Sequence, residues 1–325
     1  MFQDLPEPAL WQHTSALVEP DDFDAFWTST LAESRDRGTA PVATRVDTPL
    51  TTLEVHDVTF AGFGGDPVRA WYRRPAGVDG PLPVVVQYVG YGGGRGEATE
   101  NLLWASAGFA HLQVDTRGQG SGWSRGETPD PWGTGPQAPG VMTRGIEDPS
   151  TYYYRRLFTD AVRAVDAARL LPGADPDRVS VVGGSQGGAM AIAAGALADD
   201  VAAVVANVPF LCDIARAVGI TDSKPFAEVV EYLAVHRDAA DRVLRTLSYV
   251  DGVALARRGT APARFSVALM DTIVPPSTVV AAHREWNGPK DLRVWRYNGH
   301  ESGGPVEDQE AVAFVADTVR AAPAG

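Results

Sequence analysis

The stretch "RVSVVGGSQGGAMAIAAGALA", residues 178–198, decides the fold. A short β-branched run leads through a glycine-rich turn into ten residues that favour a helix. The turn, "GGSQG" at residues 183–187, fits the G-x-S-x-G pattern of a nucleophile elbow, in which a serine stands on a sharp bend between strand and helix. Gly183 and Gly187 are then the small residues that let strand and helix approach each other. The pattern predicts Ser185 as a nucleophile.

A glycine-rich turn between a strand and a helix also occurs where proteins bind phosphate groups. The spacing argues against that alternative, because "GGSQGG" at residues 183–188 does not supply G-x-G-x-x-G. No GK[ST] sequence occurs in the chain either, so there is no P-loop motif.

Short apolar runs alternate with longer helical stretches in much of the chain, which is the order of a mostly parallel central sheet flanked by helices. Together with the elbow, this order predicts the α/β-hydrolase fold. Helical patterns are clearest at residues 150–171 and 308–322. We expect six core strands, at residues 82–89, 108–115, 178–184, 201–208, 263–270 and 291–297.

Four further segments complete the predicted architecture. Residues 21–36 predict an N-terminal helix, because their apolar side chains recur at helical spacing behind acidic residues. Residues 51–75 predict an antiparallel hairpin at the edge of the sheet, with "AGFGGD" as its turn. Residues 121–149, rich in glycine and proline, predict an extended loop, and residues 209–258 a helical excursion over the sheet.

Composition and charge limit the function. The 325 residues, 44% hydrophobic and 21% charged, predict one domain over residues 1–325. A formal net charge of −13 argues against nucleic acid and anionic membranes as partners. The single cysteine, Cys212, allows no intramolecular disulfide and no CxxC metal site, and its apolar neighbours predict a core position. The N-terminus lacks the pattern of a secretory signal, so we expect a cytoplasmic protein.

A serine nucleophile needs a histidine as general base and a carboxylate that orients the histidine. In this fold the order along the chain is Ser, acid, His, and three of the six histidines follow Ser185. His236 and His283 fall in expected helices, whereas His300 follows the last expected strand. Asp271 ends the strand before it, with capping of the following helix as its alternative role. The order predicts a Ser185–Asp271–His300 catalytic triad.

Two glycine-rich turns complete the predicted site. "YVGYGGGRG", residues 88–96, follows the first core strand, where this fold supplies an oxyanion-hole amide. The backbone amides of Tyr91 and Gln186 are therefore the candidate oxyanion donors, with a plain flexible loop as the alternative for "GYGGG". Arg117 and Gln119 also lie at a strand exit. Arg117 has two interpretations: it binds an anionic substrate, or, as the residues favour, it pairs with a carboxylate and holds loops beneath the site.

The sequence resembles carbohydrate esterase family 7, the acetyl xylan esterases and cephalosporin C deacetylases. The resemblance is carried by an RGQ motif at residues 117–119, a GxSQG elbow at 183–187 and a late HE pair at 300–301, and it runs from about residue 20 to 305. Many members read HGY where this chain has Val89-Gly90-Tyr91, and cysteine where it has Val274. The first difference concerns the expected acyl pocket, and the second suggests a change in packing.

The resemblance implies a serine esterase that removes acetyl groups from small acetylated substrates, acetylated xylo-oligosaccharides and cephalosporin C among them. It also implies a homo-hexamer, for which residues 121–149 would supply an interface loop, and perhydrolysis with peroxide as acyl acceptor. No metal or organic cofactor is expected. The residues leave two alternatives: a serine peptidase of the prolyl oligopeptidase type, and a non-catalytic hydrolase-fold binding protein.

Overall fold

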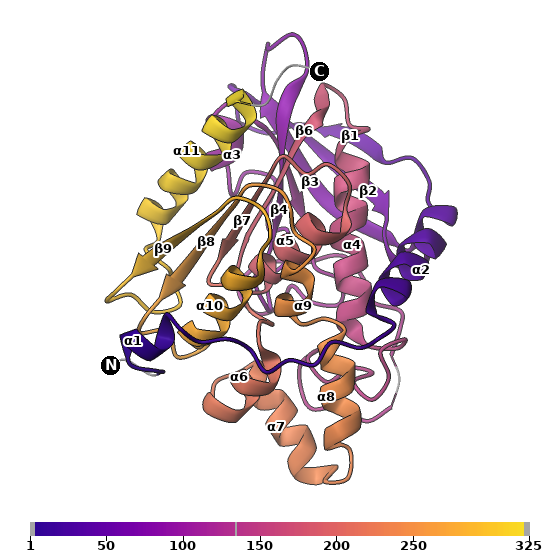
Figure 1. The fold of residues 1–325 in the computed structure, drawn as a ribbon. Helices are drawn as coiled ribbons and strands as arrows, with labels where there is room; N and C mark the ends of the chain where they lie inside the picture. The colour runs from indigo at the N-terminus through magenta and orange to yellow at the C-terminus, as the bar shows by residue number, and fades with distance from the viewer. Residues whose placement is uncertain (1–3, 134, 322–325) are drawn as a thin grey trace.

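Nine strands form a single sheet in the computed structural model, which describes residues 4–133 and 135–321 (Figure 1). Predictions for residues 1–3, 134 and 322–325, including the last residue of the helix expected at 308–322, lie outside the described residues. The strands are β1 (Val42–Val46), β2 (Leu53–Ala61), β3 (Pro67–Pro75), β4 (Leu82–Tyr88), β5 (Ala110–Val114), β6 (Ala174–Gly184), β7 (Ala203–Asn207), β8 (Ala263–Ala268) and β9 (Lys290–Trp295).

The strand order is β1-β2-β3-β5-β4-β6-β7-β8-β9. The strands from β5 to β9 along this order pair in parallel, whereas β1, β2 and β3 pair antiparallel. Each of the six expected core strands overlaps an observed one. The predicted hairpin is present as β2 and β3, but it is not the edge of the sheet, because β1 pairs outside β2. Residues 42–46 escaped prediction because this edge strand buries none of its side chains and so lacks a strand's apolar alternation.

Helices cover both faces of the sheet. They are α1 (Glu7–Leu10), α2 (Phe23–Asp36), α3 (Leu103–Ser106), α4 (Tyr153–Ala168), α5 (Gln186–Leu197), α6 (Ile214–Ile220), α7 (Phe226–Val235), α8 (Ala240–Ser248), α9 (Gly252–Ala256), α10 (Pro276–Glu285) and α11 (Pro305–Ala321), with a 3₁₀ turn, η1, at Phe63–Gly65. Helix α11 begins three residues before the expected helix, since a proline fits the first turn of a helix.

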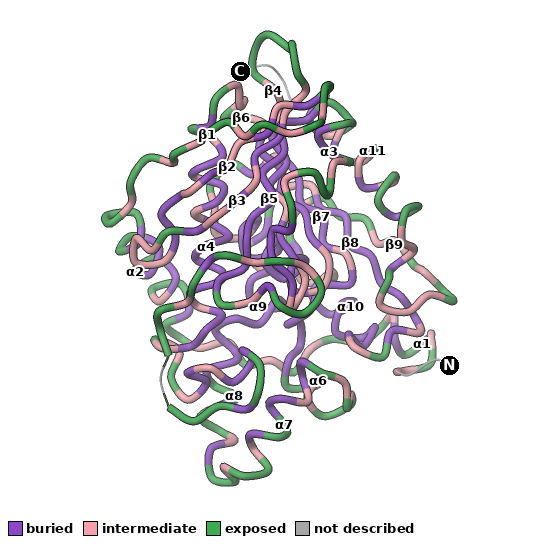
Figure 2. The backbone as a smooth tube through the Cα atoms, turned by 180° about the vertical axis from the view of Figure 1, so that it is seen from behind, coloured by how far each residue is buried: buried purple, intermediate pink, exposed green. Residues whose placement is uncertain are grey.

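The alternating side chains of the central strands separate the core into two layers. Val84 and Val86 of β4 pack into the larger layer with α4 and α5, whereas Val85 faces α3 and α11 on the other side of the sheet. Figure 2 shows the resulting continuous buried region along the central strands. Helix α5 is buried along most of its length, which explains why its sequence is apolar on all sides. The predicted core position of Cys212 agrees with its full burial.

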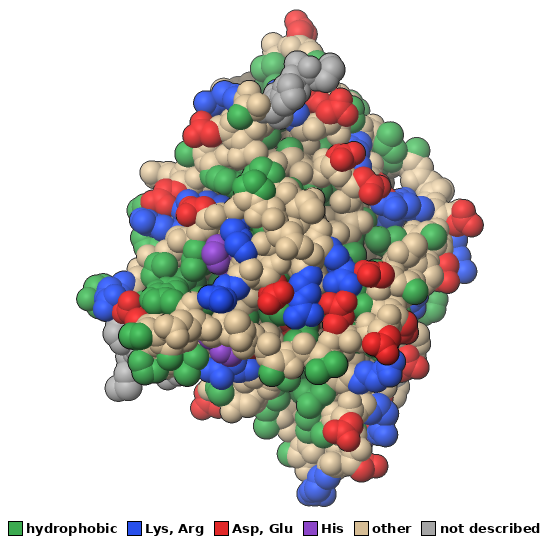
Figure 3. Space-filling view, viewed as in Figure 1, with side chains coloured by type: hydrophobic (Ala, Val, Ile, Leu, Met, Phe, Trp, Pro, Cys, Tyr) green, Lys and Arg blue, Asp and Glu red, His purple; other side chains and the backbone are tan. Residues whose placement is uncertain are grey.

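The two irregular segments have different structures. Among the described residues of 121–149 there is no helix and no strand, while residues 209–258 contain α6 to α9, of which α6, α7 and α8 lie below the sheet in Figure 1. No helix within the described residues has the length and apolar character needed to cross a membrane. On the face shown in Figure 3, basic and acidic side chains alternate, and no extended basic surface is formed there.

Candidate active site

Ser185 occupies the bend between β6 and α5 with φ 55° and ψ −120°. This backbone conformation is unfavourable for a residue with a side chain, at a cost of about 1–3 kcal/mol, and such residues concentrate at functional sites. Two hydrogen bonds hold it: its amide donates to the Asn207 carbonyl at 2.9 Å, and its carbonyl accepts from the Phe210 amide at 2.9 Å. The bend therefore has the geometry expected of a nucleophile elbow.

The glycines beside Ser185 are required by close backbone contacts. A Cβ on Gly183 would lie 2.3 Å from the carbonyl carbon of Gly187, and a Cβ on Gly187 would lie 2.4 Å from the carbonyl oxygen of Tyr88. Both distances are well below van der Waals contact with backbone that has no room to move. A larger residue at either position would push α5 away from the sheet and move Ser185 with it.

Asp271 and His300 are joined by a hydrogen bond at the ends of β8 and β9. The Nδ1 atom of His300 lies 2.8 Å from Oδ2 of Asp271, and the aspartate is 1% exposed. The other carboxylate oxygen, Oδ1, accepts from the amides of Ile273 and Val274 at 2.8 and 3.0 Å. Since a carboxylate only accepts, the proton lies on Nδ1, and Nε2 is left with a lone pair. Asp271 thus fixes the turn before α10, but it does not cap that helix, whose N-cap is Pro275 and has no side-chain cap.

Ser185 and His300 line one cavity of about 580 Å³ at the carboxyl ends of the parallel strands. Ligands of α/β sheets bind at this end of the strands. No hydrogen bond joins Ser185 to His300 in the part of the chain described, and catalytic hydrogen bonds are often formed only once substrate is bound. The structure thus brings the three predicted residues to one place.

The two candidate oxyanion amides come from the elbow and from the loop after β4. Gln186 is the first residue of α5, and Tyr91 follows β4 and lines the cavity. Neither backbone N–H donates to an acceptor within residues 4–133 and 135–321. Free amides at these positions are what an oxyanion hole requires.

Gln119 of the RGQ motif connects the two candidate donors. Its Oε1 accepts from the Gly92 amide at 2.6 Å, and its Nε2 donates to Oε1 of Gln186 at 2.9 Å. The same nitrogen lies 2.9 Å from the Tyr153 hydroxyl, which donates to the Arg117 carbonyl at 2.6 Å. One side chain therefore fixes the loop after β4 relative to the elbow.

Arg117 lies behind the site and does not line the cavity. It is fully buried and donates through Nε and Nη2 to the two carboxylate oxygens of Asp160 at 2.5 and 2.7 Å. Its Nη1 also reaches Asp66 and Asp130, at 3.2 and 3.4 Å. The geometry favours the interpretation in which Arg117 holds loops, because a guanidinium with these partners has no group left for an anionic substrate.

Glu228 of α7 belongs to the surroundings of the site but was not predicted. The Tyr91 hydroxyl donates to its carboxylate, with distances of 2.8 and 3.0 Å to Oε1 and Oε2, and itself accepts from the Val141 amide at 2.7 Å. Met142 donates its amide to Oε2 at 3.1 Å. Glu228 is 2% exposed, and burial raises the pKa of its carboxyl. In the sequence it is one of two acids in an amphipathic helix, and only its tertiary contacts distinguish it from the exposed Glu231.

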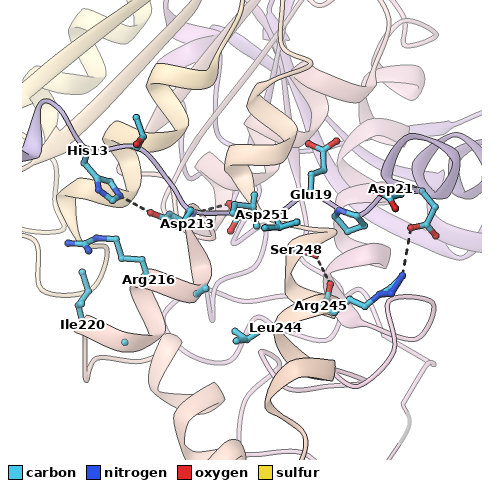
Figure 4. Close-up of a pocket in the computed structure, with 18 residues that line it drawn as sticks. His13, Glu19, Asp21, Asp213, Arg216, Ile220, Leu244, Arg245, Ser248 and Asp251 are labelled. Carbon is cyan, nitrogen blue, oxygen red and sulfur yellow. Dashed lines mark hydrogen bonds and ion pairs between the residues drawn. The ribbon is translucent and has the colours of Figure 1, made fainter.

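A larger cavity, about 1070 Å³, lies between residues 13–22, α6 and α8 (Figure 4). At its edge, Nε2 of His13 lies 2.9 Å from Oδ2 of Asp213, and the Ser15 hydroxyl donates to Oδ1 at 2.6 Å. Although serine, aspartate and histidine are all present, the hydroxyl bonds to the carboxylate and not to the imidazole. Ser15 therefore lacks the hydrogen bond to histidine that a Ser-His-Asp triad needs, and this group is not a second triad.

No group of three or more His, Cys, Asp or Glu residues within the described ranges is arranged to hold a metal ion.

Comparison with known proteins shows the family to which the chain belongs. The model of the family described as "Acetyl xylan esterase (AXE1)" matches residues 1–318. The chain belongs to the acetyl xylan esterase family. The expected family and the expected α/β-hydrolase fold are thereby confirmed, and the predicted class of enzyme, a carboxylic ester hydrolase, is supported.

Individual members of the acetyl xylan esterase family agree with this assignment. An acetyl xylan esterase from Paenibacillus sp. R4 is 37% identical, with a TM-score of 0.91, over 97% of this chain and 100% of that chain. Acetyl xylan esterase 1 from Thermoanaerobacterium sp. JW/SL YS485 is 30% identical, with a TM-score of 0.89, over 97% of this chain and 99% of that chain. Acetyl esterase Axe7A from Xylanibacter ruminicola is 28% identical over 285 residues, 86% of this chain. The chain spans 63% of the length of this last relative.

Proposed function

We propose that this protein is a serine esterase that removes acetyl groups from small acetylated substrates through an acetyl-enzyme intermediate. The observation that carries the proposal is the 2.8 Å hydrogen bond between Asp271 and His300, whose ring shares a cavity with the strained Ser185. Family membership supports it, since the matching family is that of the acetyl xylan esterases.

In the proposed mechanism the Ser185 hydroxyl attacks the acetyl carbonyl while Nε2 of His300 accepts its proton. Asp271 keeps the Nδ1 proton in place and stabilises the imidazolium. The amides of Tyr91 and Gln186 donate to the oxyanion, a contribution of a few kcal/mol to the barrier. The imidazolium then gives its proton to the departing alcohol oxygen, and the acetyl group remains on Ser185.

Deacetylation repeats these steps with water. His300 accepts a proton from the water that attacks the acetyl-enzyme carbonyl, and returns it to the Ser185 oxygen as acetate leaves. Every proton transfer in this scheme passes through His300, and no metal or organic cofactor takes part.

Acetylated xylo-oligosaccharides are the proposed natural substrates, and cephalosporin C is a second acetyl ester of interest. Val89, Pro225 and Ile273 contribute apolar atoms to the cavity wall near the nucleophile, which suits a small acyl group. The difference at Val89 from many relatives makes this wall less polar. We expect acetyl esters to be preferred over esters of longer acids.

We also propose a single catalytic domain over residues 1–325 that forms a homo-hexamer in the cytoplasm. Trp123 and Trp132, both in the irregular segment 121–149, are 66% and 45% exposed, and large exposed aromatic side chains are typical of interfaces between subunits. Light scattering coupled to size-exclusion chromatography tests the assembly.

Hydrolysis of 4-nitrophenyl esters of increasing acyl length, by the wild type and by Ser185→Ala, tests the function. The proposal predicts serine-dependent release that is fastest for the acetate. Loss of preference for acetate would reject the deacetylase assignment, and absence of serine-dependent release would favour a non-catalytic binding protein. A peptidase of the prolyl oligopeptidase type would instead cleave peptide amides.

A further inference from the structure

The active-site cavity continues past the triad to the face of the sheet that α3 and α11 cover. Trp104 of α3 and Ala311 of α11 line this part. Its volume of about 580 Å³ is of the size that holds a whole small ligand and is far larger than an acetyl group needs. Its floor is one row of residues paired in register across four neighbouring strands: Gln113, Gln87, Val182 and Val205.

Gln113 presents an unpaired hydrogen-bond donor to this space. Gln113 is 3% exposed, and its Oε1 accepts from Nη1 of Arg73 at 2.9 Å. Because a guanidinium can only donate, this contact fixes which end of the amide is oxygen. Nε2 then faces away from Arg73 and donates to no acceptor in residues 4–133 and 135–321. Because Gln113 lines the cavity, this donor is open to a ligand or to solvent there.

Gln87 supplies a second donor of the same kind from the adjacent strand. Its Oε1 lies 2.9 Å from Nε2 of His111, and since the carbonyl oxygen only accepts, the ring nitrogen donates. Burial holds the pKa of His111 well below its usual range, so the ring stays neutral. The amide nitrogen of Gln87, like that of Gln113, has no acceptor in the described structure. Gln87 and Gln113 are paired in register and both line the cavity, so their two NH₂ groups are available along its floor.

The charges around the cavity favour a neutral ligand. Lys224 is the one basic side chain other than His300 among the described residues that line it, and it pairs with Glu231 at 3.4 Å. Glu301, Glu307 and Asp308 add carboxylates to the wall. Glu307 pairs with Arg264, and Lys224 with Glu231, so no cation among the described lining residues is left unpaired for an anionic ligand, whereas hydroxyl oxygens can accept from the two amides.

Building on the esterase function proposed above, we propose that Gln113 and Gln87 form a subsite that binds the hydroxyl groups of a neutral alcohol half of the substrate. Gln87 pairs with Val182, three residues before Ser185, which places the subsite about 10 Å below the nucleophile at about 3.3 Å per residue. An acetylated sugar and the extended glutamine side chains together bridge such a backbone distance.

The test compares two esters that share the acetyl group and differ in the alcohol: a mono-acetylated methyl xyloside and 4-nitrophenyl acetate. In Gln113→Leu, the ratio of kcat/KM for the xyloside to kcat/KM for 4-nitrophenyl acetate should fall about five- to tenfold, the usual effect of one lost neutral hydrogen bond. Gln113→Glu should lower the ratio similarly, because it keeps an acceptor for Arg73 but replaces the NH₂ donor by oxygen. Thermal unfolding of both variants separates this effect from misfolding.

Gln309→Leu, an exposed glutamine on α11, is the matched control and should leave both rate constants unchanged. If the ratio is unchanged in Gln113→Glu while the wild type cleaves both esters, the subsite is wrong and the esterase function stands. If the wild type cleaves neither ester, the proposed function fails and the subsite with it. A loss that is equal for both esters also contradicts the subsite, because it shows a general change in the site.

Discussion

Gln119 donates a hydrogen bond to Gln186 at 2.9 Å and accepts one from the Gly92 amide at 2.6 Å. The two candidate oxyanion amides belong to Tyr91 and Gln186. Gln119 contacts Gln186 itself and Gly92, the residue that follows Tyr91. The spacing of the two amides thus depends on a residue that does not line the cavity. This contact gives a physical explanation for the RGQ motif. The arginine holds the loop from behind, and the glutamine sets the positions of the two candidate oxyanion donors.

Replacing Gln119 by Leu should lower kcat for 4-nitrophenyl acetate by about ten- to a hundredfold with a small change in KM, because oxyanion stabilisation acts on the transition state. Affinity for a boronic acid that mimics the tetrahedral intermediate should fall in parallel. Gln12→Leu, at an exposed glutamine, is the control. A rise in KM with unchanged kcat would contradict this role.

Tyr91→Phe and Glu228→Gln should each lower the free energy of unfolding by about 1–3 kcal/mol, since each leaves a buried polar partner incompletely bonded. The two changes should be non-additive in a double-mutant cycle, both in stability and in kcat/KM, because the side chains share one hydrogen-bond network. Glu231→Gln, on the exposed side of the same helix, should change stability by less than about 0.5 kcal/mol. Additive effects would show that the tyrosine and the carboxyl act independently.

Asp271→Asn should reduce kcat by about 10³- to 10⁴-fold with little change in KM, since an amide at this position favours the wrong tautomer of His300. The asparagine can keep Oδ1 toward the Ile273 and Val274 amides, so the fold should be retained. Steady-state kinetics together with circular dichroism measure both effects. A loss of less than tenfold in a folded variant would argue against the assigned role.

Asp251 should make stability depend on pH. Burial raises the pKa of its carboxyl to about 7, although the amides of Asp213, Ile214 and Val253 donate to it. Because this pKa is higher in the folded than in the unfolded state, the protonated carboxyl stabilises the fold. This contribution to the free energy of unfolding is fully present below the pKa of the unfolded state and is lost as pH rises through about 7.

The advantage of the wild type over Asp251→Asn should therefore shrink between pH 4 and pH 8, by at most about 4 kcal/mol at 1.36 kcal/mol per unit. Denaturant unfolding of both proteins at the two pH values measures the difference. An advantage that is constant or grows with pH would show that the carboxyl is ionised throughout.

The elbow and the core strands could be predicted from the sequence, because each depends on residues that are close together in the chain. The elbow at residues 183–187 needs small residues at fixed positions, and the strands on either side are apolar because both faces of the sheet are covered. Asp271 and His300 could be chosen by chain order, since each follows a strand of the parallel sheet and those strands end at one edge.

The features that could not be predicted from the sequence depend on contacts between residues far apart in the chain. Glu228 lies 137 residues from Tyr91 in the chain, and nothing in its helix distinguishes it from a surface acid. The free amide of Gln113 depends on Arg73 of another strand, 40 residues away. Strand β1 is exposed at the edge of the sheet and was missed because no apolar alternation marks it.

The central claim is that Ser185 carries the acetyl group between the two half-reactions. Intact-protein mass spectrometry of enzyme mixed with excess 4-nitrophenyl acetate and quenched in acid within the first turnover measures this directly. The proposed mechanism predicts a mass increase of one acetyl group that peptide mapping places on Ser185 and that is absent from Ser185→Ala. An enzyme that releases acetate at the wild-type rate without Ser185, or that carries the acetyl group on another residue, would contradict it.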